Sequence, residues 1–420
     1  MYRGYLILSG GFGLVFSESL SELREIFSGN VGVMALSWFL FGLSSSLVIP
    51  FFFLYAKALG ASDLIIAYIR SIGLYALAGS IVFGGLLTDY IGRVKTILIG
   101  TSIIVITQYA YAFVNDWFQL AIIWVIDEVA HFYQPALSAI IMDSLPRDKT
   151  LKGFLLLQAI PSIPGLFMPI IGGILYDIYG LTGVRLGFII SGTISLIVLL
   201  LRMKGLRETI TINKRVRVSN FILELRNYRV ELKNALKIFI YSGFLFQLGV
   251  AVWFTYGSIY VVEVLGSTKT EWGLLNSLIT ATMILVSLIF GFSTRLDGFK
   301  IALIGGLSIT ISQLMIAIPG YYGLYDPLIM RSAVIVGAIG NTVIWPLIST
   351  LLTKILSPEI RGRVTGFQRM FENIGMATVT ILAGYLYTGL GPANSFVFSA
   401  FINLFSTIYL LKIYLSIEKN

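Results

Sequence analysis

Residues 183–201 read GVRLGFIISGTISLIVLLL, an apolar run in which Arg185 is the only charged side chain. A helix of about 20 apolar residues is long enough to cross the hydrocarbon core of a bilayer. Similar runs recur along the chain, separated by short segments rich in glycine, proline and charged residues. The sequence therefore predicts an all-α integral membrane protein with about twelve transmembrane helices. We place these helices near residues 31–56, 64–87, 95–114, 117–141, 153–176, 183–201, 236–262, 272–293, 300–318, 327–353, 364–388 and 393–414.

The composition excludes several other classes of protein. Of the 420 residues, 57% are hydrophobic and 12% are charged, whereas soluble domains average about 25% charged residues. The mean hydropathy is +0.88. The apolar runs are too long for strands and lack the alternation of a membrane β-barrel. The absence of cysteine excludes disulfides, thiolate metal sites and a cysteine nucleophile.

Lysine and arginine are distributed unequally between the two sets of predicted loops, and this bias sets the orientation. One set carries only Lys57, Lys269, Arg185 and Arg331, whereas the set on the side of the termini holds most of the others. We therefore expect a multi-pass protein of the cell membrane with both termini in the cytoplasm. Residues 1–30 are predicted to be a cytoplasmic extension, although their short apolar stretch also fits a signal-peptide core.

A basic linker is predicted at residues 202–235. From Arg202 to Lys237 the chain has ten basic residues against three acidic ones, a net charge of +7 out of +9 for the whole chain. Apolar side chains recur there at helical spacing, so we expect an amphipathic helix on the anionic inner leaflet rather than a nucleic-acid site. The apolar positions are Phe221, Leu225, Tyr228, Leu232 and Leu236.

The linker separates two halves, 31–201 and 236–414, which resemble each other; residues 415–420 form a tail. Leu59-Gly60-Ala61-Ser62 matches Leu265-Gly266-Ser267-Thr268, and Gly173-x-x-Tyr176-x-x-x-Gly180 matches Gly384-x-x-Tyr387-x-x-x-Gly391. The matches occur in the same order in both halves. Two six-helix halves related by a pseudo-two-fold axis are typical of duplicated transporters, whose solute site lies between the halves near the midplane.

The loop after the second predicted helix reads GLLTDYIGRVK over residues 85–95. It resembles the G-x-L-x-D-R-x-G-R-[RK] signature of the major facilitator superfamily, with departures at Tyr90 and Val94. The matching residues are Gly85, Leu87, Asp89, Gly92 and Arg93. The resemblance implies an alternating-access transporter in which Asp89 faces the start of the eleventh helix, where a carboxylate gains from the helix dipole.

A second motif is matched in part. Pro169-x-x-Gly172-Gly173 resembles the end of the motif of the antiporter branch of the same family, whereas Pro164 and Met168 stand where that motif has glycine. This partial match favours an exporter.

The fourth predicted helix carries ionisable residues near its middle, where charge is costly and therefore usually functional. At 100° per residue, Asp127, His131 and Gln134 fall on one face. We predict that Asp127, Glu128 and His131 form a proton-coupling site; a polar cluster that only braces the helices is the alternative. Glu128-x-x-His131 also resembles half of a di-iron site, but the remaining ligands are missing, so we expect no metal and no cofactor.

Three further residues are candidates for the solute cavity. Arg70 in the second helix either neutralises Asp127 or Glu128 or binds an anionic solute. Trp253 and Tyr256 share a face of the seventh helix and form either an aromatic cavity wall or part of the interfacial aromatic belt.

The predicted function is secondary active transport of a small solute across the cell membrane by alternating access, in the form of proton-coupled export by a monomer. Uptake of a sugar or organic anion by a symporter or facilitator is one alternative. An integral-membrane transferase is another, but the short loops lack DDxxD, HExxH and GxxxxGK motifs, so we predict that the protein is not an enzyme.

Overall fold

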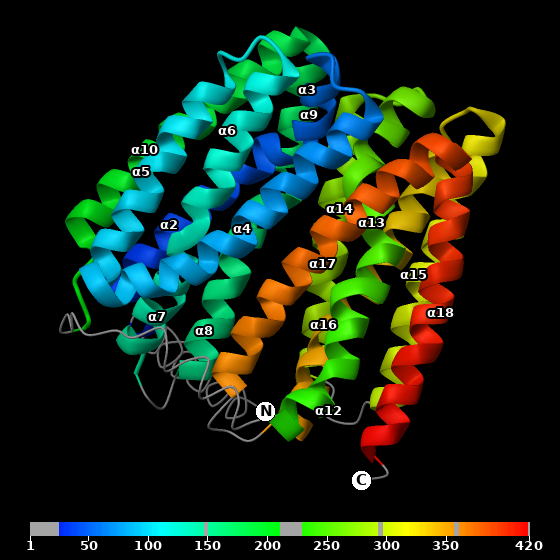
Figure 1. The fold of residues 1–420 in the computed structure, drawn as a ribbon. Coiled ribbons are helices and arrows are strands. Elements are labelled where there is room, and N and C mark those ends of the chain that lie inside the picture. Colours follow the sequence, from blue (N-terminus) through cyan, green and yellow to red (C-terminus); the bar gives the residue numbers. More distant parts are fainter. Residues whose placement is uncertain (1–24, 147–149, 211–228, 293–296, 357–360, 419–420) are drawn as a thin grey trace, which may run out of the picture.

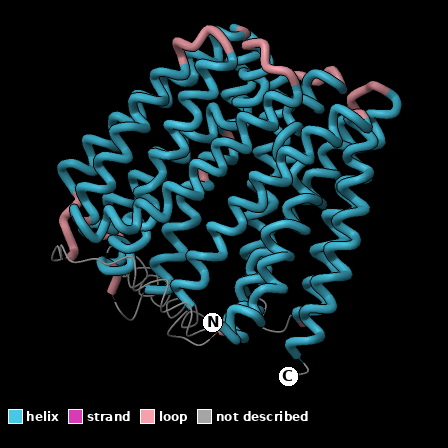
Figure 2. The backbone as a smooth tube through the Cα atoms, viewed as in Figure 1, coloured by secondary structure: helices cyan, strands magenta, loops and turns pink. Residues whose placement is uncertain are grey.

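The computed structural model describes residues 25–146, 150–210, 229–292, 297–356 and 361–418. This described part is built from helices and contains no strand (Figures 1 and 2). The predicted all-α membrane fold is therefore confirmed. The predicted extension falls mostly on residues 1–24, and most of the predicted surface helix falls on residues 211–228, so both lie outside the described residues.

The first half contains six transmembrane segments, several of which are interrupted by short 3₁₀ turns, and three of these turns have proline at one of their first two positions. Proline lacks a backbone N–H and therefore favours the first turn of a new helix. The elements are α2 (Gly29–Val48), η1 (Ile49–Phe51), α3 (Phe52–Ala58), α4 (Asp63–Ile91), α5 (Arg93–Tyr111), α6 (Trp117–Ala130), η2 (His131–Tyr133), α7 (Gln134–Ser144), α8 (Thr150–Ala159), η3 (Ile160–Ser162), η4 (Pro164–Leu166), α9 (Met168–Tyr179) and α10 (Leu181–Gly205).

The second half has longer and more regular helices, with two π-helical turns in its first segment. Its elements are α12 (Arg229–Ile240), η5 (Tyr241–Leu245), α13 (Phe246–Ile259), η6 (Tyr260–Val264), α14 (Lys269–Phe292), α15 (Gly298–Tyr322), α16 (Pro327–Ile355), α17 (Arg361–Leu390) and α18 (Pro392–Glu418).

Ten segments of the described part are long and apolar enough to cross a membrane. The other two of the twelve predicted spans are the α6–η2–α7 segment and α17, which carry polar residues within their length. Asp127 and Glu128 lie in the first of these segments, and Arg369 and Glu372 lie in the second. The least apolar spans are thus those with ionisable side chains near their middles.

Glycines at matched positions of the two halves adopt the same unusual backbone conformation. Gly60 and Gly266 have φ of 92° and 73°, and Gly180 and Gly391 have φ of 58° and 85°. Glycine tolerates this region far better than other residues. The equivalent turns therefore share their geometry, as expected for a duplicated fold.

The two halves meet along two pairs of helices. Helix α4 packs along α17 (Figure 1), and α9 packs along α14. We call the side where α2 begins and α18 ends the proximal face, and the opposite side the distal face. One hydrophobic cluster, which includes Phe51, Ile66, Tyr256 and Tyr387, joins both halves near the distal face. Nearer the proximal face, each half has a separate cluster of its own.

Candidate functional site

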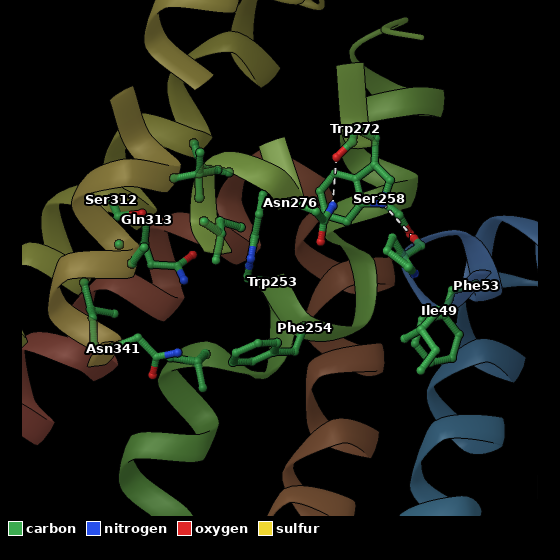
Figure 3. Close-up of a pocket in the computed structure, with 18 of the residues that line it drawn as sticks. Ile49, Phe53, Trp253, Phe254, Ser258, Trp272, Asn276, Ser312, Gln313 and Asn341 are labelled. Carbon is green, nitrogen blue, oxygen red and sulfur yellow. Dashed lines mark hydrogen bonds between the residues drawn. The ribbon is translucent and has the colours of Figure 1, made fainter. Parts of the chain in front are cut away.

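A cavity of about 380 Å³ lies between the two halves (Figure 3). This volume is in the range of small-molecule sites. Most of its wall comes from α13, α14, α15 and α16, and the first half contributes Ile49, Pro50, Phe53 and Arg70. The other lining residues are Val250, Trp253, Phe254, Ser258, Trp272, Asn276, Ile279, Ile309, Ser312, Gln313, Ile316, Val334, Gly337, Ala338 and Asn341.

Aromatic side chains close the cavity toward the distal face. The Trp272 indole N–H donates to the Pro50 carbonyl at 2.7 Å, and the Tyr256 hydroxyl donates to the Asp63 carbonyl at 2.6 Å. The Tyr256 ring stacks on Tyr387, with centroids 4.0 Å apart and planes 7° from parallel. Each hydrogen bond joins one half to the other, so these contacts hold the halves together on this side.

A carboxylate strengthens the same closure. Asp177, near the end of α9, accepts hydrogen bonds from the backbone N–H groups of Lys269 and Thr270 at 3.0 and 2.8 Å, and from the Thr270 hydroxyl at 2.7 Å. The Lys269 ammonium lies 3.8 Å from the carboxylate. Asp177 therefore caps the N-terminus of α14 across the interface, where negative charge is favourable. Gly173 permits the close approach, since a Cβ there would lie 2.4 Å from the Lys269 carbonyl oxygen.

Hydrogen bonds between the halves lie between the middle of the helices and the distal face. The one nearest the proximal face on α4 joins the hydroxyl groups of Tyr75 and Thr378 at 2.8 Å. Among the described residues, no hydrogen bond or ion pair joins the halves beyond it toward the proximal face. The structure is thus closed on its distal side.

Arg70 lies at the cavity and not in an ion pair. Its Nη1 donates to the Phe254 carbonyl at 2.8 Å, and its guanidinium carbon lies 5.5 Å from the centre of the Phe53 ring. Its Nε is buried and has no hydrogen-bond partner in the described part of the chain. Among the described residues it forms no ion pair with Asp127 or Glu128, although it interacts with Glu128 electrostatically at longer range.

The predicted proton-coupling residues occupy different environments. Asp127 is 7% exposed and accepts a hydrogen bond from the Thr107 hydroxyl, inside the first half. The His131 Nδ1 lies 2.8 Å from the Asp127 carbonyl oxygen and not from its carboxylate. Glu128 is partly buried and Gln134 is exposed. The 3₁₀ turn η2 begins at His131 and changes the rotation per residue, so the 100° spacing does not continue to Gln134.

Hydrogen-bonded polar side chains also lie in the first half, starting at Gln108, the residue that follows Thr107. The Ser191 hydroxyl donates to Gln108 Oε1 at 2.7 Å and also shares a hydrogen bond with the Ser44 hydroxyl. These side chains come from α10, α5 and α2 respectively, so polar contacts connect three helices of the first half.

The two predicted aromatic cavity residues differ in position. Trp253 lines the cavity, next to Trp272 at a centroid distance of 5.5 Å. Tyr256 is fully buried in the distal closure and is not part of the cavity wall.

The loop motif lies at the proximal face. Gly92 lies between α4 and α5 with φ of 92°, and a Cβ added at Gly85 would have no neighbouring atom within 4 Å. Arg93 donates to the Ala139 carbonyl at 3.0 Å and the Thr209 hydroxyl at 2.9 Å, and forms an ion pair with Asp143. Asp89 is exposed and makes no hydrogen bond with any described residue. Residues 357–360, before α17, lie outside the described part, so the contact of Asp89 with the eleventh span stays a prediction.

Several polar residues at the site were missed by the sequence analysis. Asn276, Gln313 and Asn341 line the cavity, and Figure 3 shows Gln313 and Asn341 across it from Ile49 and Phe53. Each is a neutral amide in an apolar run, a weaker sequence signal than a charge. Asp177 was overlooked because it lies near a predicted helix end, where acidic residues are common.

Comparison with known proteins agrees with the fold. The chain matches the model of the Major Facilitator Superfamily over residues 34–340 and 323–419. Multidrug resistance protein MdtG of Proteus mirabilis (strain HI4320) is 24% identical over 405 residues, covering 93% of this chain and 97% of its own. The uncharacterized MFS-type transporter MJ1560 of Methanocaldococcus jannaschii is 23% identical over 403 residues, covering 93% and 98%.

Solved structures share the architecture at low sequence identity. A peptide transporter POT in complex with sulfate superposes with a TM-score of 0.78 at 16% identity, covering 92% of this chain and 94% of that one. The nucleoside transporter NupG gives a TM-score of 0.74 at 14% identity, covering 92% and 99%. The fold, the cavity between two six-helix halves and the family match lead to one conclusion: this chain belongs to the major facilitator superfamily and is a multi-pass membrane transporter of small molecules, not an enzyme.

Proposed function

We propose that this transporter exports small solutes in exchange for protons by alternating access. The export direction is supported by its relatives named multidrug resistance protein MdtG, which align over nearly their whole length. The partial antiporter-branch motif at Pro169, Gly172 and Gly173 favours the same direction. With the termini in the cytoplasm, the distal face is external, and the structure corresponds to the state that loads solute from inside.

The observation that carries proton coupling is the adjacent pair Asp127 and Glu128 near the end of α6, in the middle of the α6–η2–α7 span. A charged side chain at the bilayer centre costs about 2.5–3.5 kcal/mol even on insertion scales. A carboxyl group avoids this cost by binding a proton, and it releases the proton when access to water changes. The Thr107 hydroxyl can hydrogen-bond to Asp127 in either protonation state.

Glu128 provides a connection between this acid pair and the cavity. It interacts electrostatically with Arg70, which lines the cavity, without direct contact. A change in the charge of Glu128 therefore changes the field at the solute. In this scheme His131 holds the backbone of α6 through the Asp127 carbonyl and adds a second titratable group close to the acids.

The test uses proteoliposomes preloaded with labelled aromatic acids, amines or neutral analogues, diluted into buffer that is more acidic than the interior. Antiport predicts faster efflux than at equal pH, whereas symport predicts slower efflux, because the proton would have to leave against its gradient. We expect Asp127→Asn or Glu128→Gln to abolish the response to the gradient while solute exchange at equal pH survives. His131→Gln should shift the pH optimum and keep coupling.

Asp116→Asn is the matched control, because Asp116 caps α6 far from the acid pair and asparagine is also a good helix cap. It should behave as the wild type. A normal response to the gradient in both acid variants would show that the pair is structural. Slower efflux by the wild type under the gradient than at equal pH would assign the protein to the symporters instead.

A further inference from the structure

We infer that the cavity recognises a flat, amphipathic solute with an anionic group at one end and hydrogen-bond donors at the other. This names the substrate class of the proposed exporter and therefore rests on the proposed function. It depends on three observations that concern the charge of the cavity wall, its unpaired polar atoms and its aromatic side chains.

The charge of the wall is positive. Among the described residues that line the cavity, Arg70 is the only charged one. Arginine stays protonated at any accessible pH, so this charge is permanent. The nearest interacting acid, Glu128, neither lines the cavity nor forms an ion pair with Arg70. A cationic solute would meet repulsion here, whereas an anion would find a counter-charge.

The guanidinium has unused hydrogen-bonding capacity. One Nη1 contact goes to the Phe254 carbonyl, a neutral group, and the buried Nε has no partner. Arginine binds carboxylate and phosphate groups through two parallel N–H donors. The guanidinium carbon also lies over the Phe53 ring, 5.5 Å from its centre. Arg70 is thus positioned to hold an anionic group, and no carboxylate of the described residues forms an ion pair with it.

The wall on α15 and α16 offers the opposite polarity. Gln313 Oε1 and Asn341 Oδ1 are buried acceptors that receive no hydrogen bond from any described residue. Buried polar atoms nearly always have a partner, so these acceptors require water or a solute. The neighbouring Ser312 hydroxyl cannot serve them, since it donates to the Ala333 carbonyl at 2.8 Å. A hydroxyl or amine hydrogen on the solute would satisfy this wall.

Aromatic groups line the space between these polar ends. Trp253, Phe254 and Trp272 contribute rings to the wall, and the two tryptophan rings are tilted by 60° to each other. Offset or edge-to-face packing against such rings favours a flat apolar body. The solute therefore combines a ring system with a carboxylate, sulfate or phosphonate at one end.

The experiment measures binding by calorimetry to the full-length protein in lipid nanodiscs, without a pH gradient. Four probes share one ring: 5-hydroxyindole-3-acetate, indole-3-acetate, 5-hydroxyindole-3-acetamide and 5-hydroxytryptamine. We expect the hydroxylated acid to bind at least 10-fold more tightly than the neutral amide and the amine, and more tightly than the acid without the hydroxyl.

Variants assign the preference to residues. Arg70→Gln should remove the advantage of the acid over the amide, and Arg70→Lys should retain part of it. Gln313→Leu should remove only the advantage of the hydroxyl group, and Asp116→Asn should change neither. The four-probe comparison on the wild type needs no variant and stays decisive if Arg70→Gln does not fold.

Equal or tighter binding of the amine, or no binding of either acid, would overturn the inference. Because no proton gradient is present, these results are independent of coupling. An anion preference without gradient-driven efflux would reject only the proposed function, and gradient-driven efflux without an anion preference would reject only this inference.

Discussion

Removing the charge of Asp177 should open the distal side of the transporter. Its carboxylate caps α14 of the other half with three hydrogen bonds and lies 3.8 Å from the Lys269 ammonium. Asp177→Asn keeps one acceptor oxygen but loses the interaction with the helix dipole and the lysine. Asp177→Ala also loses the hydrogen bonds.

The magnitude follows from the contacts. A charge at a helix N-terminus contributes about 0.3–1 kcal/mol, and up to about 2 kcal/mol when partly buried. The Asp177 side chain is 26% exposed, so we take about 1 kcal/mol for the asparagine variant and about 2 kcal/mol for the alanine variant. Since 1.4 kcal/mol is a factor of ten, the population open on the distal side should rise roughly 5-fold and roughly 30-fold.

The chain has no cysteine, so a single thiol can report on access without further changes. Ser258 lines the cavity and is 5% exposed, which makes Ser258→Cys a suitable reporter position. The labelling rate with a membrane-impermeant maleimide, applied to intact cells, measures opening toward the distal face. We expect the rate to increase by the two factors given above.

Asp116→Asn is again the control, because Asp116 accepts comparable hydrogen bonds from the Phe118 and Gln119 N–H groups, both at 2.9 Å, within one half. It should leave the labelling rate unchanged. Equal labelling rates in Asp177→Asn and Asp116→Asn would refute the argument that the cap across the interface holds the distal side closed.

Two further predictions concern the proximal side. Asp89→Asn should leave the protein folded, shift it toward the distally closed state and slow transport. Asp89 has no described partner in the distally closed state, so the variant loses about 0.3–1 kcal/mol only in a state where Asp89 faces the start of a helix. Unchanged transport kinetics in a correctly inserted variant would contradict this prediction. Reporters fused after residue 420 and within residues 205–220 should both report the cytoplasmic side, and an external signal from either would reject the orientation drawn from the basic residues.

The fold was predictable because a bilayer leaves few choices. Backbone polar groups in the membrane must be satisfied within each segment, so long apolar runs become helices. The repeated glycine positions revealed the duplication, and the paired positive φ angles of Gly60 and Gly266 agree with it. The loop at residues 85–95 indicated the family. None of these inferences required knowledge of which helices touch.

The site was less predictable, because its contacts join residues far apart in the sequence. The face containing Asp127 and Gln134 was derived for a regular helix, and the turn at His131–Tyr133 separates these residues into a buried and an exposed position. Gln313 and Asn341 are uncharged, so they do not stand out in apolar stretches of the sequence as ionisable residues do. Only packing reveals that their acceptors are unsatisfied.

The sequence by itself thus determined the helical membrane fold, its duplication and its family, since hydrophobic run length and local turn chemistry act over short stretches of chain. The tertiary structure alone decided that Arg70 lies at the cavity and not in an ion pair, that Tyr256 belongs to the distal closure and that Asp177 caps a helix of the other half. These outcomes depend on how the two halves pack against each other, and that packing depends on the shapes of whole helix faces, not on any local pattern.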